Sequence, residues 1–209
     1  MQKRAYSVLI LILLVGGMLI GKQFQQSNSR SNVGDILRDL AGGGPAAQQD
    51  GISVYFSPHG GCEAAVVQQI GLGRQTIDMQ AYSFTSMAVA HALADAESRG
   101  VHVRAVLDRT ATDEHSQEAA YLQEHGIPVY TDGDHPIAHN KVIVVDGQNV
   151  ITGSFNYTHQ AENANAENLV ILTGKLDIAA AYERNFELHL GHSQPFSEGA
   201  IPSRSGRSR

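Results

Sequence analysis

The chain has 209 residues, of which 42% are hydrophobic, and this length and composition fit one globular domain with a substantial core. Its formal net charge of -6 provides no general attraction to polyanions, so a nucleic acid would have to bind at a local site. The single cysteine, Cys62, excludes an intramolecular disulfide, and a small buried thiol is its favoured interpretation.

The N-terminus carries an apolar run, residues 5–21, behind a short basic segment, residues 1–4. The run is at the short end of what spans a bilayer. A signal peptide begins in the same way, but no small-x-small cleavage site directly follows Gly21. The pattern favours an uncleaved single-pass anchor in a bacterial cell membrane, with the rest of the chain facing the periplasm or exterior. Secretion after signal cleavage is the alternative.

Two polar segments border the folded part. Residues 22–50 are rich in Gln, Ser, Gly and Pro and are predicted to be a flexible linker. Residues 193–209 are predicted to be a flexible tail with solvated arginines. The folded domain is therefore expected at residues 51–192.

Strand-like and helix-like runs alternate through this domain. In chain order the pattern predicts a strand at 52–56, a helix at 61–73, strands and helices in turn at 76–83, 86–100, 101–108, 114–126 and 127–132, a hairpin at 141–154, a strand at 168–174 and a helix at 176–190. The turn dipeptide Asp146-Gly147 marks the hairpin. This alternation indicates an α/β fold in which a mixed β-sheet is flanked by helices on both faces, preceded by the N-terminal transmembrane helix.

Polar side chains gather at the ends of this hairpin. His139 and Lys141 have the same strand parity and are expected on one face, and Ser154 and Asn156 are paired in the same way. Gly153 is expected to let the backbone approach a ligand. One imidazole, one ammonium and two neutral donors suit a tetrahedral anion such as a phosphodiester. Asp146 has the opposite parity, which indicates a structural or orienting residue.

The pattern HxKxxxxDxxxxxxGSxN, from His139 to Asn156, resembles the signature of the phospholipase D superfamily. The segments YFSP, IDMQAYSFTS, IPVYTD, IAHNKV, ITGSFNYT and NAENLVIL resemble its small bacterial endonuclease branch, whose members carry a single such motif. The resemblance covers residues 52–190. It implies a phospholipase D-like catalytic domain that cleaves phosphodiesters without a metal or other cofactor.

The resemblance also implies roles for individual residues. His139 is expected to attack phosphorus and form a covalent phosphohistidine. Lys141, Ser154 and Asn156 are expected to bind the phosphate. Glu167 matches an acidic position that orients the catalytic imidazole, with a surface residue before a strand as the alternative interpretation. Asp146 belongs to the same catalytic motif.

In-line displacement needs an acid on the side of the leaving group, and one imidazole cannot also attack from the other side. No second His-x-Lys occurs in the sequence. Single-motif members of the family pair two chains, and a twofold axis brings identical residues together. The resemblance therefore implies a homodimer with one composite site, and a bell-shaped pH profile.

Histidines near acidic residues raise a metal-binding alternative. Asp132, Asp134, His135 and His139 lie close together in the sequence. Two aspartates around a glycine more often make a turn, so the turn is the favoured interpretation and no metal site is predicted.

Two further groups have open interpretations. The turn around His59 precedes a predicted helix, whose backbone N–H groups could meet a phosphate. The aromatic residues Tyr82, Phe84, Phe155 and Tyr157 could stack on bases, although core packing is the commoner fate of such residues.

Three functions follow. The favoured one is a non-specific endonuclease cutting DNA or RNA. The alternative is a phospholipase D-type hydrolase of membrane phospholipids, which the apolar N-terminus and the acidic charge favour. An inactive phosphate-binding protein is the third, and the complete motif argues against it.

Overall fold

A computed structural model describes residues 44–112 and 116–197. The predicted anchor at residues 5–21 lies outside the described residues, as do most of the linker and most of the tail. Within the described ranges, no helix combines the length and the apolar character needed to cross a membrane.

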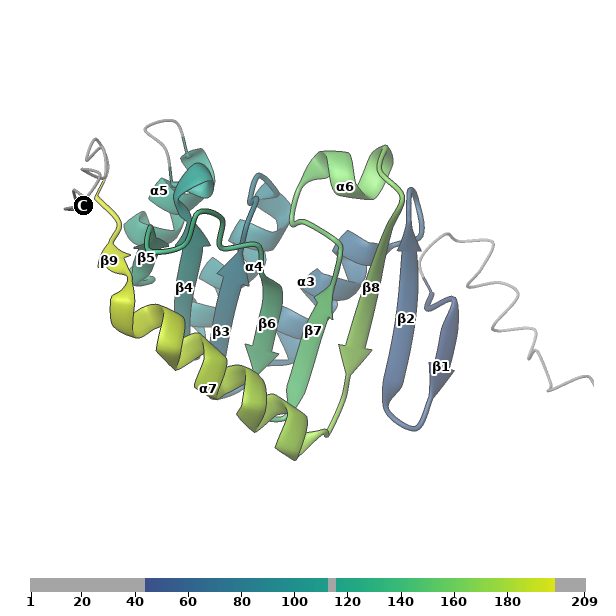
Figure 1. Ribbon diagram of the computed structural model, residues 1–209. Coiled ribbons are helices and arrows are strands. Elements are labelled where there is room, and N and C mark those ends of the chain that lie inside the picture. Colours follow the sequence, from purple (N-terminus) through teal and green to yellow (C-terminus); the bar gives the residue numbers. More distant parts are fainter. Residues whose placement is uncertain (1–43, 113–115, 198–209) are drawn as a thin grey trace, which may run out of the picture. The chain divides into compact units, whose positions relative to one another are not determined.

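The described residues form one nine-stranded sheet with the order β1-β2-β8-β7-β6-β3-β4-β5-β9 (Figure 1). Strands β3, β4 and β5 run parallel to one another, and all other neighbours pair antiparallel. The sheet is therefore mixed, as predicted. The strand bounds are β1 Ala47–Gln49, β2 Ile52–Ser57, β3 Thr76–Ala81, β4 His102–Asp108, β5 Val129–Asp132, β6 Lys141–Val145, β7 Asn149–Gly153, β8 Glu167–Leu172 and β9 Gln194–Pro195.

Helices cover both faces of the sheet, which confirms the predicted α/β arrangement of the folded domain. In Figure 1 the long helix α7 crosses the near face, and α3, α4 and α5 lie behind the strands. A short helix, α6, follows β7 at the upper edge of the view. The helix bounds are α3 Cys62–Leu72, α4 Met87–Ser98, the 3-10 turn η1 Arg109–Ala111, α5 Gln117–Glu124, α6 His159–Asn163 and α7 Leu176–His192.

Strand β6 shows why the hairpin reads as apolar throughout. Its residues alternate between two cores: Ile143 and Val145 join the large core with α3, α4 and α5, whereas Val142 and Val144 join the smaller one that contains Ala179 of α7. All five positions of β6 are buried. A strand covered on both faces has no solvent side, so its sequence loses the polar alternation of an edge strand.

The turns and caps follow from local chemistry. Asp146 and Gly147 both have positive φ, 54° and 62°, as the predicted two-residue hairpin turn requires. The Ser86 hydroxyl caps α4 by accepting a hydrogen bond from the N–H of Val89. These positions carry the turn and cap residues that their geometry demands.

One predicted ligand site is already filled. The N–H groups of Gly61 and Glu63, at the start of α3, donate to the two carboxylate oxygens of Glu162, at 3.0 and 2.8 Å. The turn after His59 therefore binds a side chain of α6, and the interpretation of these N–H groups as phosphate donors is wrong. A carboxylate satisfies a helix start by the same electrostatics that a phosphate would use.

The folded part also extends further than the predicted boundaries at both ends. β1 lies in the predicted linker and pairs with β2. β9 lies in the predicted tail and pairs with β5. Both strands are too short to leave a periodic pattern in the sequence.

Candidate active site

The predicted site residues other than Asp146 lie at one edge of the sheet. The parallel strands β3, β4 and β5 end at this edge, and the antiparallel strand β6 begins there, with Lys141 beside Ala81, the last residue of β3. β7 ends at the same edge, and β8 begins there with Glu167, which pairs with Ser57. Sheet topology thus gathers residues that are far apart in the sequence.

His139 and Lys141 lie side by side, although not by strand alternation. Lys141 is the first residue of β6, whereas His139 lies in the preceding loop and is exposed. The Lys141 ammonium donates a hydrogen bond to the backbone carbonyl of His139 at 2.9 Å. The ring of Tyr82 contacts both: its centroid lies 4.4 Å from that of the imidazole and 4.8 Å from Lys141 Nζ. A buried cation therefore sits beside an exposed imidazole.

Lys141 is only 6% exposed. Burial lowers the pKa of its ammonium, and the nearby carboxylates of Glu167 and Asp108 partly offset this effect. These two carboxylates place negative charge around the cation.

Ser154 and Glu167 form a hydrogen-bonded pair. Ser154 Oγ donates to Glu167 Oε2 at 2.6 Å and accepts from the N–H of Asn168 at 3.0 Å. The other oxygen of Glu167 accepts from Asn165 Nδ2 at 3.1 Å. Within residues 44–112 and 116–197, no hydrogen bond joins Glu167 to His139, so the orienting role of Glu167 stays a prediction.

Asn156 lies just past the end of β7. Its side-chain oxygen is buried and has no hydrogen-bond partner in the described part of the chain. Buried amides are normally satisfied, so an unpartnered acceptor oxygen at this position is unusual.

Gly153 has a role that the sequence analysis did not predict. It adopts φ 144°, and a Cβ at this position would overlap the carbonyl oxygen of Asn168, which accepts from the N–H groups of Ser154 and Phe155. The glycine is needed for the close approach of β7 and β8, and the close approach to a ligand stays a prediction.

Asp146 lies at the other end of β6, away from the site. Its carboxylate accepts hydrogen bonds from the N–H groups of Arg74, Gln75 and Thr76, at 2.7 to 3.1 Å. This is the structural role that strand parity predicts. Its inclusion among the catalytic residues is corrected, because β6 spans five residues, about 16 Å, between Asp146 and the site.

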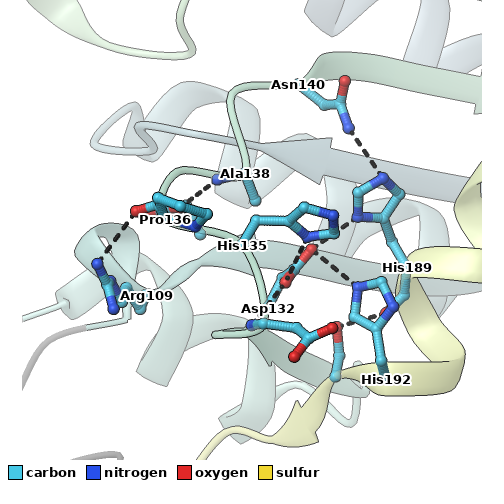
Figure 2. A network of polar contacts seen from close by, with 11 residues as sticks. Arg109, Asp132, His135, Pro136, Ala138, Asn140, His189 and His192 are labelled. Carbon is cyan, nitrogen blue, oxygen red and sulfur yellow. Dashed lines mark hydrogen bonds and ion pairs between the residues drawn. The ribbon is translucent and has the colours of Figure 1, made fainter. Parts of the chain in front are cut away.

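The loop that carries His139 is held by two residues that the sequence analysis missed. Asp108 ends β4 and is buried, and its Oδ2 accepts from the N–H of Ala138 at 2.7 Å. The guanidinium of Arg109 donates to the carbonyl of Pro136 at 3.0 Å, as Figure 2 shows. The sequence did offer a signal for Asp108, because an aspartate at the end of a buried parallel strand is expected at the edge where such strands end together.

The aromatic residues divide between core and site. Phe84, Phe155 and Tyr157 are almost fully buried, which confirms core packing for these three. Tyr82 remains half-buried beside His139. Only Tyr82 is thus available near the imidazole for stacking on a ligand.

The four residues considered as metal ligands in the sequence do not all lie together. Asp132 and His135 lie together, joined by His189 and His192 from α7 (Figure 2). Neither Asp134 nor His139 belongs to this group.

Comparison with known proteins agrees with this architecture. Residues 66–190 match the family model described as cardiolipin synthase, PLD-like domain. A phospholipase D of Rickettsia prowazekii is 36% identical over 165 residues, which are 79% of this chain and 76% of the relative. A mitochondrial cardiolipin hydrolase of Xenopus tropicalis is 30% identical over 64% of this chain and 63% of the relative.

A solved structure of similar sequence shares the fold. The crystal structure of Nuc from Salmonella typhimurium, a phospholipase D family member, is 35% identical and superposes with a TM-score of 0.67, covering 69% of this chain and 97% of Nuc. The family match covers more than half of the chain and contains the whole motif at the sheet edge. The chain therefore belongs to the phospholipase D superfamily and is a hydrolase of that superfamily.

Proposed function

We propose that the protein is a metal-independent phosphodiesterase that cleaves nucleic acid non-specifically through a covalent phosphohistidine on His139. The observation that carries this proposal is that the ammonium of Lys141 and the imidazole of the exposed residue His139 both contact the ring of Tyr82, while the ammonium donates to the backbone carbonyl of His139. The imidazole is accessible to a substrate, and the cation beside it can neutralise a nonbridging phosphate oxygen without a metal ion.

The chemistry takes two displacements. A ring nitrogen of His139 attacks phosphorus, the bond from phosphorus to the leaving oxygen breaks, and that oxygen takes a proton from a second imidazole on the opposite side. A water molecule then attacks phosphorus, gives its proton to the second imidazole, and the phosphorus–nitrogen bond breaks. The second imidazole alternates between acid and base, so the enzyme returns to its starting state.

The partner subunit's His139 is the candidate for this second imidazole. A homodimer with its twofold axis at the sheet edge would place the two imidazoles on opposite sides of one phosphate. Both Lys141 ammoniums would then contact the nonbridging oxygens, and the Asn156 amide would add a neutral donor. Ser154 would add a second one if its hydroxyl turned from Glu167 to the phosphate.

Nucleic acid is the favoured substrate. The half-buried ring of Tyr82 offers a surface beside His139 on which a base next to the scissile phosphate can stack. The similarity to Nuc, which covers nearly all of that chain, supports the same choice.

A phospholipid is the second candidate. Ile137, two residues before His139, is 55% exposed, and Phe56, at the end of β2 nearest Glu167, is 54% exposed. Apolar side chains at the border of a site can contact acyl chains. Relatives named phospholipase D and mitochondrial cardiolipin hydrolase support this alternative.

The proposed location is a cell membrane, with residues 5–21 as an uncleaved anchor and the catalytic domain in the periplasm or exterior. The apolar sequence of that segment and its basic flank support this placement. Release after signal cleavage would give the same domain in soluble form.

The test compares two substrates in one buffer. The full chain, purified in mild detergent, is incubated in excess EDTA with labelled single-stranded DNA and, separately, with vesicles containing cardiolipin. His139→Ala is the active-site variant. His102→Ala is the matched control, because His102 is exposed at the start of β4, the opposite edge of the sheet.

The expected result is DNA cleavage by the parent and by His102→Ala, with a loss of at least about a thousand-fold in His139→Ala. Cleavage of cardiolipin without cleavage of DNA would contradict the proposed nuclease function and support the phospholipase function. Equal activity of His139→Ala and the parent would overturn the histidine mechanism for either substrate. Circular dichroism in the same buffer shows that the chain remains folded during the assay.

A further inference from the structure

Four potential metal ligands meet beside the loop that leads to His139. Asp132 ends β5 and His135 follows it in the loop, whereas His189 and His192 lie in the last turns of α7 (Figure 2). One donor atom from each of the four lies within 4.8 Å of the others. These residues are separate from the HxK motif and from its phosphate-binding partners.

The three imidazoles surround one carboxylate. Asp132 Oδ2 lies 2.6 Å from His189 Nδ1 and 3.2 Å from His192 Nε2, and Asp132 Oδ1 lies 3.3 Å from His135 Nδ1. The centroids of the three rings are 5.0 to 5.2 Å apart in every pair. Positions i and i+3 share a face of a helix, so His189 and His192 point together at β5.

The carboxylate at the centre of the cluster is buried. The Asp132 side chain is 0% exposed, and a buried carboxylate is costly unless positive charge or hydrogen bonds compensate it. One ring nitrogen of each imidazole lies within 3.3 Å of this carboxylate.

A divalent ion would compensate the buried carboxylate and use the four donor atoms that the cluster brings together. Three nitrogen donors and one carboxylate oxygen form a donor set that suits zinc, which takes four tetrahedral ligands at about 2.0 to 2.2 Å. Such bonds separate neighbouring donor atoms by about 3.3 Å. Donors already within 4.8 Å can reach that spacing through small side-chain rotations.

We propose that Asp132, His135, His189 and His192 bind one Zn²⁺ as a structural site. All four positions are filled by protein side chains, which is the arrangement of a structural zinc and leaves no open position for a substrate. The ion therefore has no part in the phosphodiester chemistry at His139.

The site would connect α7 to the catalytic loop. His189 Nε2 lies 3.5 Å from Asn140 Nδ2, and Asn140 stands between His139 and Lys141 in the chain. When His189 binds zinc through Nδ1, its Nε2–H is free to donate to the Asn140 amide oxygen once that amide is turned over. The zinc would thus hold both the end of α7 and the residue next to the nucleophile.

The test measures metal and stability without any substrate. The full chain, with no histidine tag, is dialysed against EDTA, reloaded with Zn²⁺ or with Co²⁺ alone, and freed of excess metal. His135→Ala and His192→Ala each remove one ligand at a partly exposed position, 44% and 31% exposed, where truncation leaves the core intact. His102→Ala is the matched control.

The expected result is about one zinc per chain in the parent and in His102→Ala. Zinc should raise the melting temperature of both by about 10 °C, and Co²⁺ should give the visible absorption of a tetrahedral site. Both ligand variants should bind less than a tenth as much zinc and show no rise. Equal zinc binding in parent and ligand variants, or no shift of the parent's melting temperature, would overturn the proposal. A chain that binds zinc and cleaves nothing would leave this site standing and remove only the proposed function.

Discussion

The ammonium of Lys141 donates a hydrogen bond to the backbone carbonyl of His139, at 2.9 Å. The proposed phosphate-binding cation and the proposed nucleophile are therefore linked within one chain. Lys141 is nearly buried, so its charge is held where it opposes folding.

Replacing Lys141 should separate function from stability. Burial lowers the pKa of Lys141 below its usual 10.5, so the unfolded chain binds this proton more tightly than the folded one. The resulting cost to folding is fully present below the folded pKa and disappears as pH rises toward 10.5. We expect Lys141→Met to lose at least about a thousand-fold in kcat, yet to unfold at pH 7 at a temperature no lower than the parent.

Calorimetry at pH 7 and near pH 10 checks this prediction. The advantage of Lys141→Met over the parent should shrink at the higher pH. Lys175→Met, at the N-cap of α7 and half-buried, serves as the control for losing a lysine away from the site. A melting temperature well below that of the parent at pH 7 would mean that the bond to the His139 carbonyl outweighs the burial cost.

Tyr82 should act through its ring. Its contacts with His139 and Lys141 are made by the aromatic face, and no hydrogen bond of its hydroxyl is needed for them. We expect Tyr82→Phe to keep kcat within about twofold and Tyr82→Leu to lose about ten-fold or more, because the imidazole loses its packing surface. Steady-state kinetics on a phosphodiester with a coloured leaving group measures both. Equal kcat values for the two variants would contradict a positioning role for the ring.

Asp146 should matter for stability and not for catalysis. Asp146→Ala removes the acceptor for three backbone N–H groups, which we expect to cost about 2 kcal/mol in the free energy of unfolding. Asp146→Asn is the matched control, because it keeps one acceptor oxygen and tolerates the positive φ of the turn. Denaturant titration gives the free energies, and kcat at 20 °C should stay within about threefold of the parent. A hundred-fold fall in kcat of the folded variant would restore a catalytic role.

Local patterns in the sequence predicted the elements well and the long-range contacts poorly. The Asp146-Gly147 dipeptide and the apolar run of β6 identified the hairpin, because turn type and burial are local properties. The sequence analysis correctly predicted that His139 and Lys141 lie close together. The argument from strand parity was wrong, because His139 lies before the first residue of β6. The fit of β7 against β8 at Gly153 depends on a neighbour fifteen positions away, which a single sequence does not reveal.

The histidine cluster shows the same limit more strongly. Asp132 and His135 are close in the chain and drew attention, but their partners His189 and His192 lie 57 and 60 positions beyond Asp132. Only the docking of α7 against β5 and β6 joins the two pairs. The alternation of strands and helices predicted that a final helix would cover the sheet, but not which of its residues would face which strand.

The pH dependence of kcat should be bell-shaped. The proposed mechanism needs one neutral imidazole to attack and one protonated imidazole to release the leaving oxygen, so activity falls when both are protonated and when both are neutral. The profile is measured from about pH 5 to 9 at constant ionic strength, with circular dichroism at each pH to confirm folding. A flat profile across this range would contradict the histidine pair.

Mixed dimers should show whether the site is shared between two chains. In the proposed site, each subunit supplies one of the two imidazoles at the phosphate. A dimer of one parent chain and one His139→Ala chain therefore lacks either the nucleophile or the acid and should be inactive. Denaturing and refolding the two chains together at varied ratios gives a random mixture, in which activity per total chain should follow the square of the parent fraction. His102→Ala in place of His139→Ala leaves activity independent of the ratio and controls for losses in refolding. A linear dependence on the parent fraction would mean that each chain works alone, and the second imidazole would then have to come from the same chain.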